Sequence, residues 1–179
     1  MVKPCIVIAG PPGSGKSTVG PLLAAELGVP FRDSDDDIVA RAGRPVADIF
    51  ATDGEPAFRE LEAEVIAEAL REHEGVLSVG GGSVLTPVTQ DRLRGHHVVF
   101  LNVGFAVGVR RVGLSTARPL LAGVNPRATY RELLEARLPV YRAVATMEVG
   151  TDERTPEEVV AVIAAQLTEE AEKTGEKTR

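Results

Sequence analysis

A glycine-rich segment near the N-terminus constrains the fold more than any other feature. The run GPPGSGKST at residues 10–18 fits the phosphate-binding pattern G-x-x-x-x-G-K-[ST]. It follows an apolar run at residues 5–9, which is typical of a buried parallel strand, and it precedes an apolar helical pattern from Val19 to Leu27. This order of strand, loop and helix predicts an α/β protein with a binding site for ATP or GTP.

Each part of this loop suits an anion. Glycine adopts backbone conformations closed to residues with a Cβ, so successive N–H groups can turn toward phosphate oxygens. Lys16 adds a positive charge, Ser17 offers a hydroxyl to Mg²⁺, and the following helix contributes its positive N-terminal end. A glycine-rich turn without a ligand is the alternative, but such a turn does not require this flanking strand and helix. The predicted nucleotide contacts are Gly13, Ser14, Gly15, Lys16, Ser17 and Thr18.

Composition limits the partners of the chain. Its 179 residues carry a net charge of −6, with a pI near 5.2, which argues against a nucleic-acid-binding surface. No apolar run approaches the ~18 residues of a membrane span and no export signal precedes the first strand, so we expect a cytoplasmic protein without a membrane partner. The single Cys5 excludes an internal disulfide and is expected to be a buried structural thiol. The length predicts one domain at residues 1–168, and nothing in it demands more than a monomer.

Carboxylates cluster where a short second strand should give way to a helix, in the sequence DSDDD at residues 33–37. Ligands of open α/β sheets lie at the carboxyl ends of the strands, so Asp33 and Asp35 are expected to face the bound triphosphate. On an extended segment a spacing of two places both on one side, where Asp33 could hold Mg²⁺ through water and Asp35 could accept a proton from an attacking hydroxyl. The alternative is helix capping by Asp35, and for Asp36 and Asp37 we prefer a solvated first helical turn.

Three further apolar runs, at 76–79, 97–101 and 147–149, complete a predicted five-stranded parallel sheet. Gly80, Gly81 and Gly82 follow the third strand, where they either admit a ligand close to the backbone or form a tight turn. The expected helices lie at 37–42, 55–72, 105–112, 127–144 and from 156 onward, with a turn at 46–50.

Polar residues in these segments have two interpretations. Arg59 and Glu62 lie three apart on one helix, so Glu62 could orient the guanidinium, although such pairs are more often solvated. The histidines lack metal-ligand spacing and are expected in exposed turns: His73, His96 and His97.

A glycine- and proline-rich segment at 113–126 carries Arg118 in its middle. Such loops over a phosphate site exclude water and deliver a cation to the transferred group, which predicts a mobile lid; a plain surface loop is the alternative. Residues 169–179 are strongly charged, and we expect a solvated, disordered tail there.

Taken together, these motifs resemble the shikimate kinase family, small enzymes of the nucleoside monophosphate kinase class. The resemblance covers residues from about 4 to 165. It rests on the phosphate loop, DSD at 33–35, DGEPAFR at 53–59, VGGG at 79–82, RPLL at 118–121 and RLPVY at 137–141. It implies a three-layer P-loop NTPase fold with helices on both faces of the sheet, a small substrate-binding helical region at about 34–62, and the lid.

The resemblance also implies a reaction, in which ATP with Mg²⁺ phosphorylates the 3-hydroxyl of shikimate on the route to chorismate and the aromatic amino acids. The implied catalytic residues are Lys16, Asp35 and Arg118. The implied metal contacts are Ser17 and Asp33, and the implied shikimate contacts are Asp35, Arg59, Gly80, Gly81, Gly82 and Arg137, with Phe50 and Phe58 beside the ring. The implied nucleotide contacts beyond the loop are Arg111, Arg118, Arg154 and Pro156. Family members often carry an aspartate near the adenine, where this chain has Val149-Gly150-Thr151.

Other functions remain open at this point. A gluconate or other small-metabolite kinase would share the phosphate loop but would not require Arg59, Gly80–Gly82 and Arg137 together. A noncatalytic nucleotide-binding module is the second alternative. A GTP-dependent switch would need N-K-x-D and D-x-x-G motifs, and neither pattern occurs in the chain.

Overall fold

The computed structural model describes residues 5–113 and 123–176 and contains one five-stranded sheet. The strands are β1 (Ile6–Ala9), β2 (Phe31–Asp33), β3 (Val76–Ser78), β4 (His97–Asn102) and β5 (Met147–Gly150). They lie in the order β2-β3-β1-β4-β5, and every pairing is parallel. Ile6 in the central strand lies opposite both Val76 and His97. The predicted parallel sheet is therefore confirmed, and all five carboxyl ends meet at one edge.

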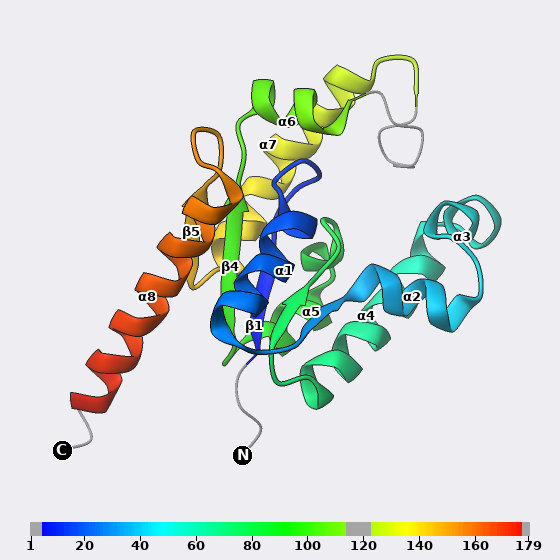
Figure 1. Cartoon of the computed structure of the whole chain (residues 1–179). Helices are drawn as coiled ribbons and strands as arrows, with labels where there is room; N and C mark the ends of the chain where they lie inside the picture. Colours follow the sequence, from blue (N-terminus) through cyan, green and yellow to red (C-terminus); the bar gives the residue numbers. More distant parts are fainter. Residues whose placement is uncertain (1–4, 114–122, 177–179) are drawn as a thin grey trace.

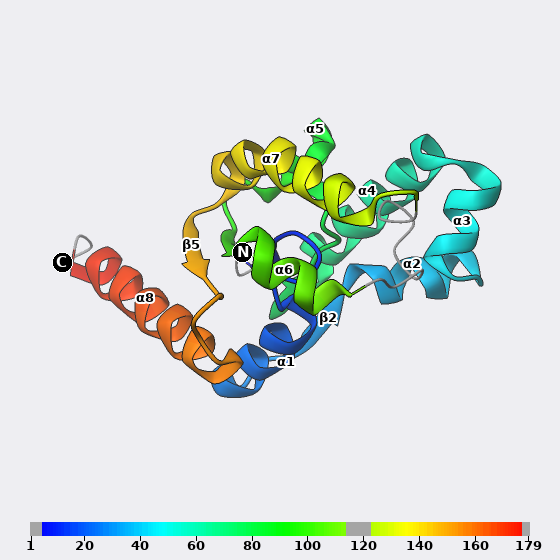
Figure 2. The same cartoon turned by 90° about the horizontal axis from the view of Figure 1, so that it is seen from above.

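Helices cover both faces of this sheet (Figures 1 and 2). On one face lie α1 (Lys16–Leu27) and α8 (Pro156–Glu176). On the other lie α4 (Glu55–Glu72), α5 (Pro87–Leu93) and α7 (Pro126–Val144). Separate apolar cores fill the two interfaces, one around Val7 and Phe100 and the other around Ile8 and Leu101. Because successive residues of a strand point to opposite faces, strands covered on both sides are apolar throughout. The predicted three-layer α/β fold is confirmed.

A second group of helices lies beyond the β2 edge of the sheet (Figure 1). It consists of α2 (Ser34–Ala42), α3 (Val46–Asp53) and the N-terminal part of α4. Its small core of Ile38, Ile49, Phe58 and Val65 is distinct from the two cores of the sheet. This core fixes the segments that carry Asp35 and Arg59. The remaining elements are α6 (Phe105–Val112) and the 3₁₀ turn η1 (Ser83–Leu85).

Capping residues explain several helix boundaries. Asp33 caps α2, since its side chain accepts a hydrogen bond of 2.8 Å from the Asp35 N–H. Thr155 and Glu158 form a reciprocal capping box at α8, with each side chain accepting from the other's backbone N–H. Gly28 ends α1 in a left-handed conformation, with φ of 65°, which glycine adopts without steric cost.

The structure corrects four predictions of secondary structure. Helix α2 begins at Ser34 rather than residue 37 because Asp33 caps it, and the expected turn at 46–50 is a helix through Asp53. The segment after the glycines contains η1 and α5, which the prediction lacked although Thr86-Pro87 is a common helix start. Helix α8 continues to Glu176, where a disordered tail was expected from residue 169. Backbone hydrogen bonds propagate this helix from a well-capped start through residues of good helix propensity.

The prediction that the histidines lie in exposed turns was also wrong, whereas the prediction that Cys5 is a buried thiol is confirmed. All three histidines are half-buried, and two bind the backbone: His96 Nδ1 accepts from the Cys5 N–H at 2.9 Å, and His73 Nε2 lies 3.0 Å from the Val76 carbonyl oxygen. Cys5 is fully buried and its thiol donates to the His73 carbonyl at 2.6 Å. Burial raises the pKa of this thiol.

Within residues 5–113 and 123–176, no helix is both long and apolar enough to cross a membrane.

Candidate active site

The phosphate loop joins β1 to α1 and begins at the carboxyl edge of the sheet. Gly13 and Gly15 have φ values of 82° and 98°, in the left-handed region that favours glycine. A Cβ on Gly13 would also lie 2.9 Å from the Gly108 carbonyl oxygen of α6. Lys16 Nζ donates to the Gly10 carbonyl at 2.7 Å and to the Pro11 carbonyl at 3.2 Å. The loop is thus shaped by its own glycines and by the side chain of Lys16.

A cavity of about 410 Å³ opens beside this loop. It is lined by Pro12, Gly13, Gly15, Lys16, Ser17, Thr18, Asp33, Asp35, Ser78, Val79, Gly80, Gly81 and Arg111. The cavity therefore combines the predicted donor residues with the predicted base, the predicted metal contacts and two of the three glycines. Ser14, a predicted nucleotide contact, does not line the cavity because it is fully buried. Its N–H donates to the Pro11 carbonyl within the loop.

Asp33 and Asp35 reach the cavity from different elements. Asp33 ends β2, whereas Asp35 lies in the first turn of α2, so the expected single extended segment is wrong although both side chains face the same space. Burial raises the pKa of the Asp33 carboxyl, and the neighbouring negative charges of Asp35 and Asp36 add to this effect. The hydrogen bond from the Asp35 N–H and the positive charge of Lys16 lower the pKa of this carboxyl in part.

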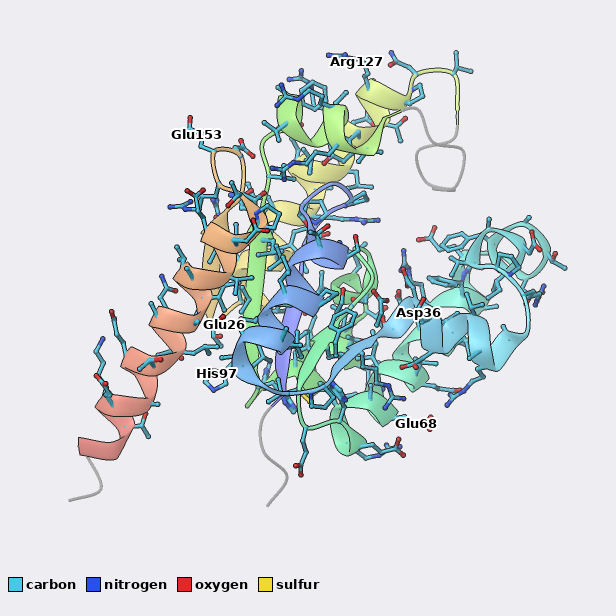
Figure 3. The ribbon with its side chains drawn as sticks, in the orientation of Figure 1. Glu26, Asp36, Glu68, His97, Arg127 and Glu153 are labelled. Carbon is cyan, nitrogen blue, oxygen red and sulfur yellow. The ribbon has the colours of Figure 1, made fainter. Side chains whose placement is uncertain are left out.

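The side chain of Asp36 projects from α2 and is exposed (Figure 3), as predicted. The same prediction was wrong for Asp37, which is half-buried and accepts a hydrogen bond of 2.6 Å from Arg32 Nε.

Each glycine after β3 faces a different charged side chain. A Cβ on Gly80 would lie 2.8 Å from Glu62 Oε2 and 3.2 Å from Asp35 Oδ1. The corresponding atom on Gly81 would lie 3.5 Å from Arg137 Nη1. On Gly82 it would collide with the Arg59 guanidinium. The three glycines thus permit acidic and basic groups from three helices to approach one short stretch of backbone.

Arg59 and Glu62 form the pair that the sequence suggested, and it is buried rather than solvated. Arg59 Nη1 donates to Glu62 Oε1 at 2.7 Å, and Glu62 is only 2% exposed. Burial raises the pKa of the Glu62 carboxyl, while the charge and hydrogen bond of Arg59 act in the opposite direction. Glu55 Oε1 accepts a second bond from Arg59, at 3.3 Å. The guanidinium is therefore held on two sides, and its carbon lies 5.2 Å from the Phe58 ring centroid.

Arg137 lies on α7 with a side chain that is almost wholly buried. Tyr141 follows it by one turn and donates from its hydroxyl to the Gly81 carbonyl oxygen at 2.5 Å. Burial raises the pKa of Tyr141 to about 12, although Arg137 lowers it through its charge and a hydrogen bond to the phenol. A buried arginine beside the glycines suits a ligand carboxylate, because a guanidinium binds one bidentately.

Comparison with known proteins agrees with this geometry. The sequence model of the shikimate kinase family matches residues 12–168. The chain belongs to the shikimate kinase family. Curated shikimate kinases from Saccharopolyspora erythraea and Thermobifida fusca are 60% and 54% identical to it, over 93% and 92% of this chain and 95% of each relative.

Solved structures support the same assignment. A shikimate kinase from Acinetobacter baumannii in complex with shikimate superposes with a TM-score of 0.90 at 33% identity, covering 93% of this chain and 94% of that one. A gluconokinase from Sinorhizobium meliloti reaches a TM-score of 0.64 at 23% identity, covering 99% of both chains. At that identity the likeness concerns the fold alone.

In this member of the shikimate kinase family, two of the arginines predicted to bind the nucleotide make contacts that the sequence did not indicate. Arg111 donates to the Gly13 carbonyl at 3.2 Å and twice to Thr151, at 2.9 Å and 2.8 Å. It therefore joins α6, the phosphate loop and the segment after β5. Arg154 donates to the Gly150 carbonyl at 2.8 Å and lines a separate cavity of about 360 Å³, next to Pro156 at the start of α8. The structure thus brings Arg111, but not Arg154, to the main cavity.

Two tyrosines are the other residues that the prediction missed. Tyr130 and Tyr141 on α7 donate to carbonyl oxygens of Pro12 and Gly81. Tyr141 belongs to the RLPVY run and could have been noticed there, whereas no motif marks Tyr130. Arg118, the predicted lid arginine, lies outside the residues that the structure describes.

Proposed function

We propose that the protein transfers the γ-phosphoryl group of ATP to the 3-hydroxyl of shikimate, giving 3-phosphoshikimate and ADP for aromatic amino-acid biosynthesis. One observation carries this proposal: the phosphate loop, Asp35, Gly80 and Gly81 line the same cavity, and the buried Arg137 and the guanidinium of Arg59 lie against Gly81 and the adjacent Gly82. Similarity to a shikimate kinase in complex with shikimate supports the choice of acceptor.

On the donor side, backbone N–H groups of Gly13 and Gly15 and the N-terminus of α1 bind the phosphates. Lys16 turns from the Gly10 and Pro11 carbonyls to the β- and γ-phosphates, where it offsets charge during transfer. The remaining loop contacts, Ser14, Ser17 and Thr18, complete the cradle, with Ser14 supporting it from inside. Arg111 stacks on the adenine, Arg154 and Pro156 lie at its far side, and Arg118 contacts the phosphates from the lid.

Mg²⁺ fits the oxygen ligands at this cavity. Ser17 and Asp33 both line it, and Mg²⁺ commonly takes one or two protein oxygens together with water and phosphate oxygens. Burial raises the pKa of the Asp33 carboxyl, and a nearby dication would favour its ionised form. When bound, the ion neutralises charge on the β- and γ-phosphate oxygens.

On the acceptor side, Arg59 and Arg137 clamp the shikimate carboxylate, while Gly80–Gly82 let the ligand approach the backbone closely. This orientation brings the 3-hydroxyl to Asp35. Asp35 accepts the hydroxyl proton as the oxygen forms its bond to the γ-phosphorus, and the bond from that phosphorus to the β-phosphate oxygen breaks to release ADP. Positioning of the two reactants and neutralisation of charge on the transferred group together supply most of the catalysis in such transfers.

We further propose that the chain acts as a cytoplasmic monomer with one kinase domain at 1–168, a substrate-binding region at about 34–62 and a lid at about 113–126. Neither nucleic acid nor membrane is a partner. The net charge of −6 supports the first of these exclusions.

The direct test is coupled ADP release by the purified protein with ATP and Mg²⁺. Shikimate, gluconate and no acceptor are compared, and 3-phosphoshikimate is identified by mass spectrometry. We expect turnover with shikimate alone. Turnover with gluconate alone would overturn the acceptor but keep the donor site, whereas turnover with no acceptor dependence would overturn the kinase assignment.

A further inference from the structure

Two tyrosine hydroxyls connect helix α7 to the two loops that meet at the active site. Tyr130 donates to the Pro12 carbonyl oxygen of the phosphate loop at 2.6 Å. Tyr141 donates to the Gly81 carbonyl oxygen of the glycine segment at 2.5 Å. The two residues are eleven positions apart, which is about three helical turns, so both lie on one face of α7. Figure 2 shows α7 along one face of the sheet, opposite α1 and α8.

The two loops also lie against each other. A Cβ on Gly81 would lie 3.2 Å from the Gly10 carbonyl oxygen and 3.4 Å from Pro12 Cδ. Fixing both loops to one helix therefore fixes the distance between the phosphate donor and the acceptor.

Both tyrosines are suited to this role. Tyr130 and Tyr141 are 2% and 1% exposed, so their hydroxyls are buried and a lost hydrogen bond is not replaced by bulk water. The Tyr141 ring stacks on Phe100 of β4 with centroids 4.8 Å apart, which anchors it in the core independently of the hydroxyl. Its pKa of about 12 keeps the phenol protonated at neutral pH, so that it remains a donor.

We propose that Tyr130 is a positioning residue for the phosphate loop and Tyr141 a positioning residue for the glycine segment, with α7 as their common support. This inference rests on the proposed function for the identity of the acceptor. In this proposal the Tyr130 hydroxyl affects only the ATP site and the Tyr141 hydroxyl only the shikimate site. A purely structural role would affect both sites alike.

The test replaces each hydroxyl while keeping its ring, with Tyr130→Phe and Tyr141→Phe. We expect Tyr141→Phe to raise KM for shikimate by about 2- to 12-fold and to leave KM for ATP within about twofold, and Tyr130→Phe to do the reverse. Thr89→Val is the matched control, since the Thr89 hydroxyl is buried on α5 without a hydrogen-bond partner among the described residues. It should change neither KM.

Equal effects of both tyrosine variants on the two KM values would overturn the proposal, as would no effect of either on its assigned KM. Binding of ADP, measured by calorimetry, separates this result from a failure of the proposed function. If the unmodified protein does not phosphorylate shikimate, the acceptor is wrong, yet Tyr130→Phe should still weaken ADP binding. Unchanged ADP binding in that variant would overturn the role of Tyr130 whatever the acceptor.

Discussion

The phosphate loop and the proposed acceptor site are built in opposite ways. The loop comes from consecutive residues between β1 and α1, and its shape follows from glycine φ values and local hydrogen bonds. The proposed acceptor site draws Asp35 from α2, Arg59 from α4, the glycines from the end of β3 and Arg137 from α7. Its geometry depends on how three helices pack, so a change there can damage one substrate site and spare the other.

The largest expected effect is that of Asp35→Asn. The amide keeps the shape of the side chain but cannot accept a proton as a base, so kcat should fall by about 10²- to 10⁴-fold. KM for ATP should change much less, because the loop does not depend on this group. Steady-state kinetics with both substrates measure the two effects.

Asp36→Asn is the matched control for this variant. It makes the same chemical change one residue along α2, on an exposed side chain that does not line the cavity. Its kcat should equal that of the unmodified protein. Near-normal turnover by Asp35→Asn would remove Asp35 from the role of base.

Arg137→Ala should have the next largest effect, and it should fall on the acceptor. Loss of a buried carboxylate clamp costs about 2 to 4 kcal/mol in kcat/KM for shikimate, mostly through KM. A carboxylate-free analogue should lose little. Arg142→Ala removes an exposed arginine of the same helix and should leave both constants unchanged. Equal losses for shikimate and the analogue would contradict the clamp.

Glycine substitutions separate the phosphate loop from the proposed acceptor site directly. Gly82 has φ of −95°, which any residue adopts, so Gly82→Ala should act only through collision of the new methyl group with the Arg59 guanidinium. We expect KM for shikimate to rise about tenfold and KM for ATP to stay constant. Gly13→Ala, strained by its φ of 82°, should instead impair ATP.

Gly175→Ala is the control for both glycine variants, since a Cβ there meets nothing within 4 Å. Its KM values should equal those of the unmodified protein. If Gly82→Ala raised both KM values alike, the independence of the phosphate loop and the proposed acceptor site would be refuted.

The smallest expected effect concerns Glu62 and is best measured as stability against pH. Because burial raises its folded-state pKa above the ordinary value of 4.5, the carboxyl favours folding while it is protonated, and this contribution is lost as pH rises through the folded pKa. The loss is about 1.4 kcal/mol for each pH unit between the two pKa values. Glu62→Gln lacks this titration, so its stability relative to the unmodified protein should improve from pH 4.5 upward.

Urea unfolding of both proteins at several pH values checks this expectation. In Glu62→Gln the KM for shikimate should rise only a few-fold, because the amide oxygen still accepts a hydrogen bond from Arg59. Glu55→Gln is the control, because it neutralises the other, more exposed carboxylate that pairs with Arg59. Comparing the two variants separates the effect of losing an ionic partner of Arg59 from the effect of removing a buried charge. A relative stability that instead declined with rising pH would mean that the Arg59 pairing outweighs the cost of burial.

The fold was predictable where periodicity and turn residues repeat over several positions. Apolar runs located β1, β3, β4 and β5, and glycine or proline marked the starts of the long helices. The short strand β2 was predicted from its place before the carboxylate cluster. Short elements were not predictable in the same way. Helix α5 has seven residues, and α3 is stabilised by burying Ile49 in a core shared with α2 and α4, which no local pattern specifies.

Sequence alone determined the phosphate loop, because its ligand groups are backbone N–H groups whose positions follow from adjacent glycines and the helix that starts at Lys16. It also marked Asp35, Arg59 and Arg137 through their family motifs. Tertiary structure decided what lies between them: Asp33 caps a helix, Glu62 is buried, and two hydroxyls of α7 hold the loops. The two tyrosine contacts join residues 118 and 60 positions apart, and only the packing of α7 on the sheet brings them within hydrogen-bonding distance. Asp33 and Glu62 bond residues only two and three positions away, but packing decides that Glu62 is buried.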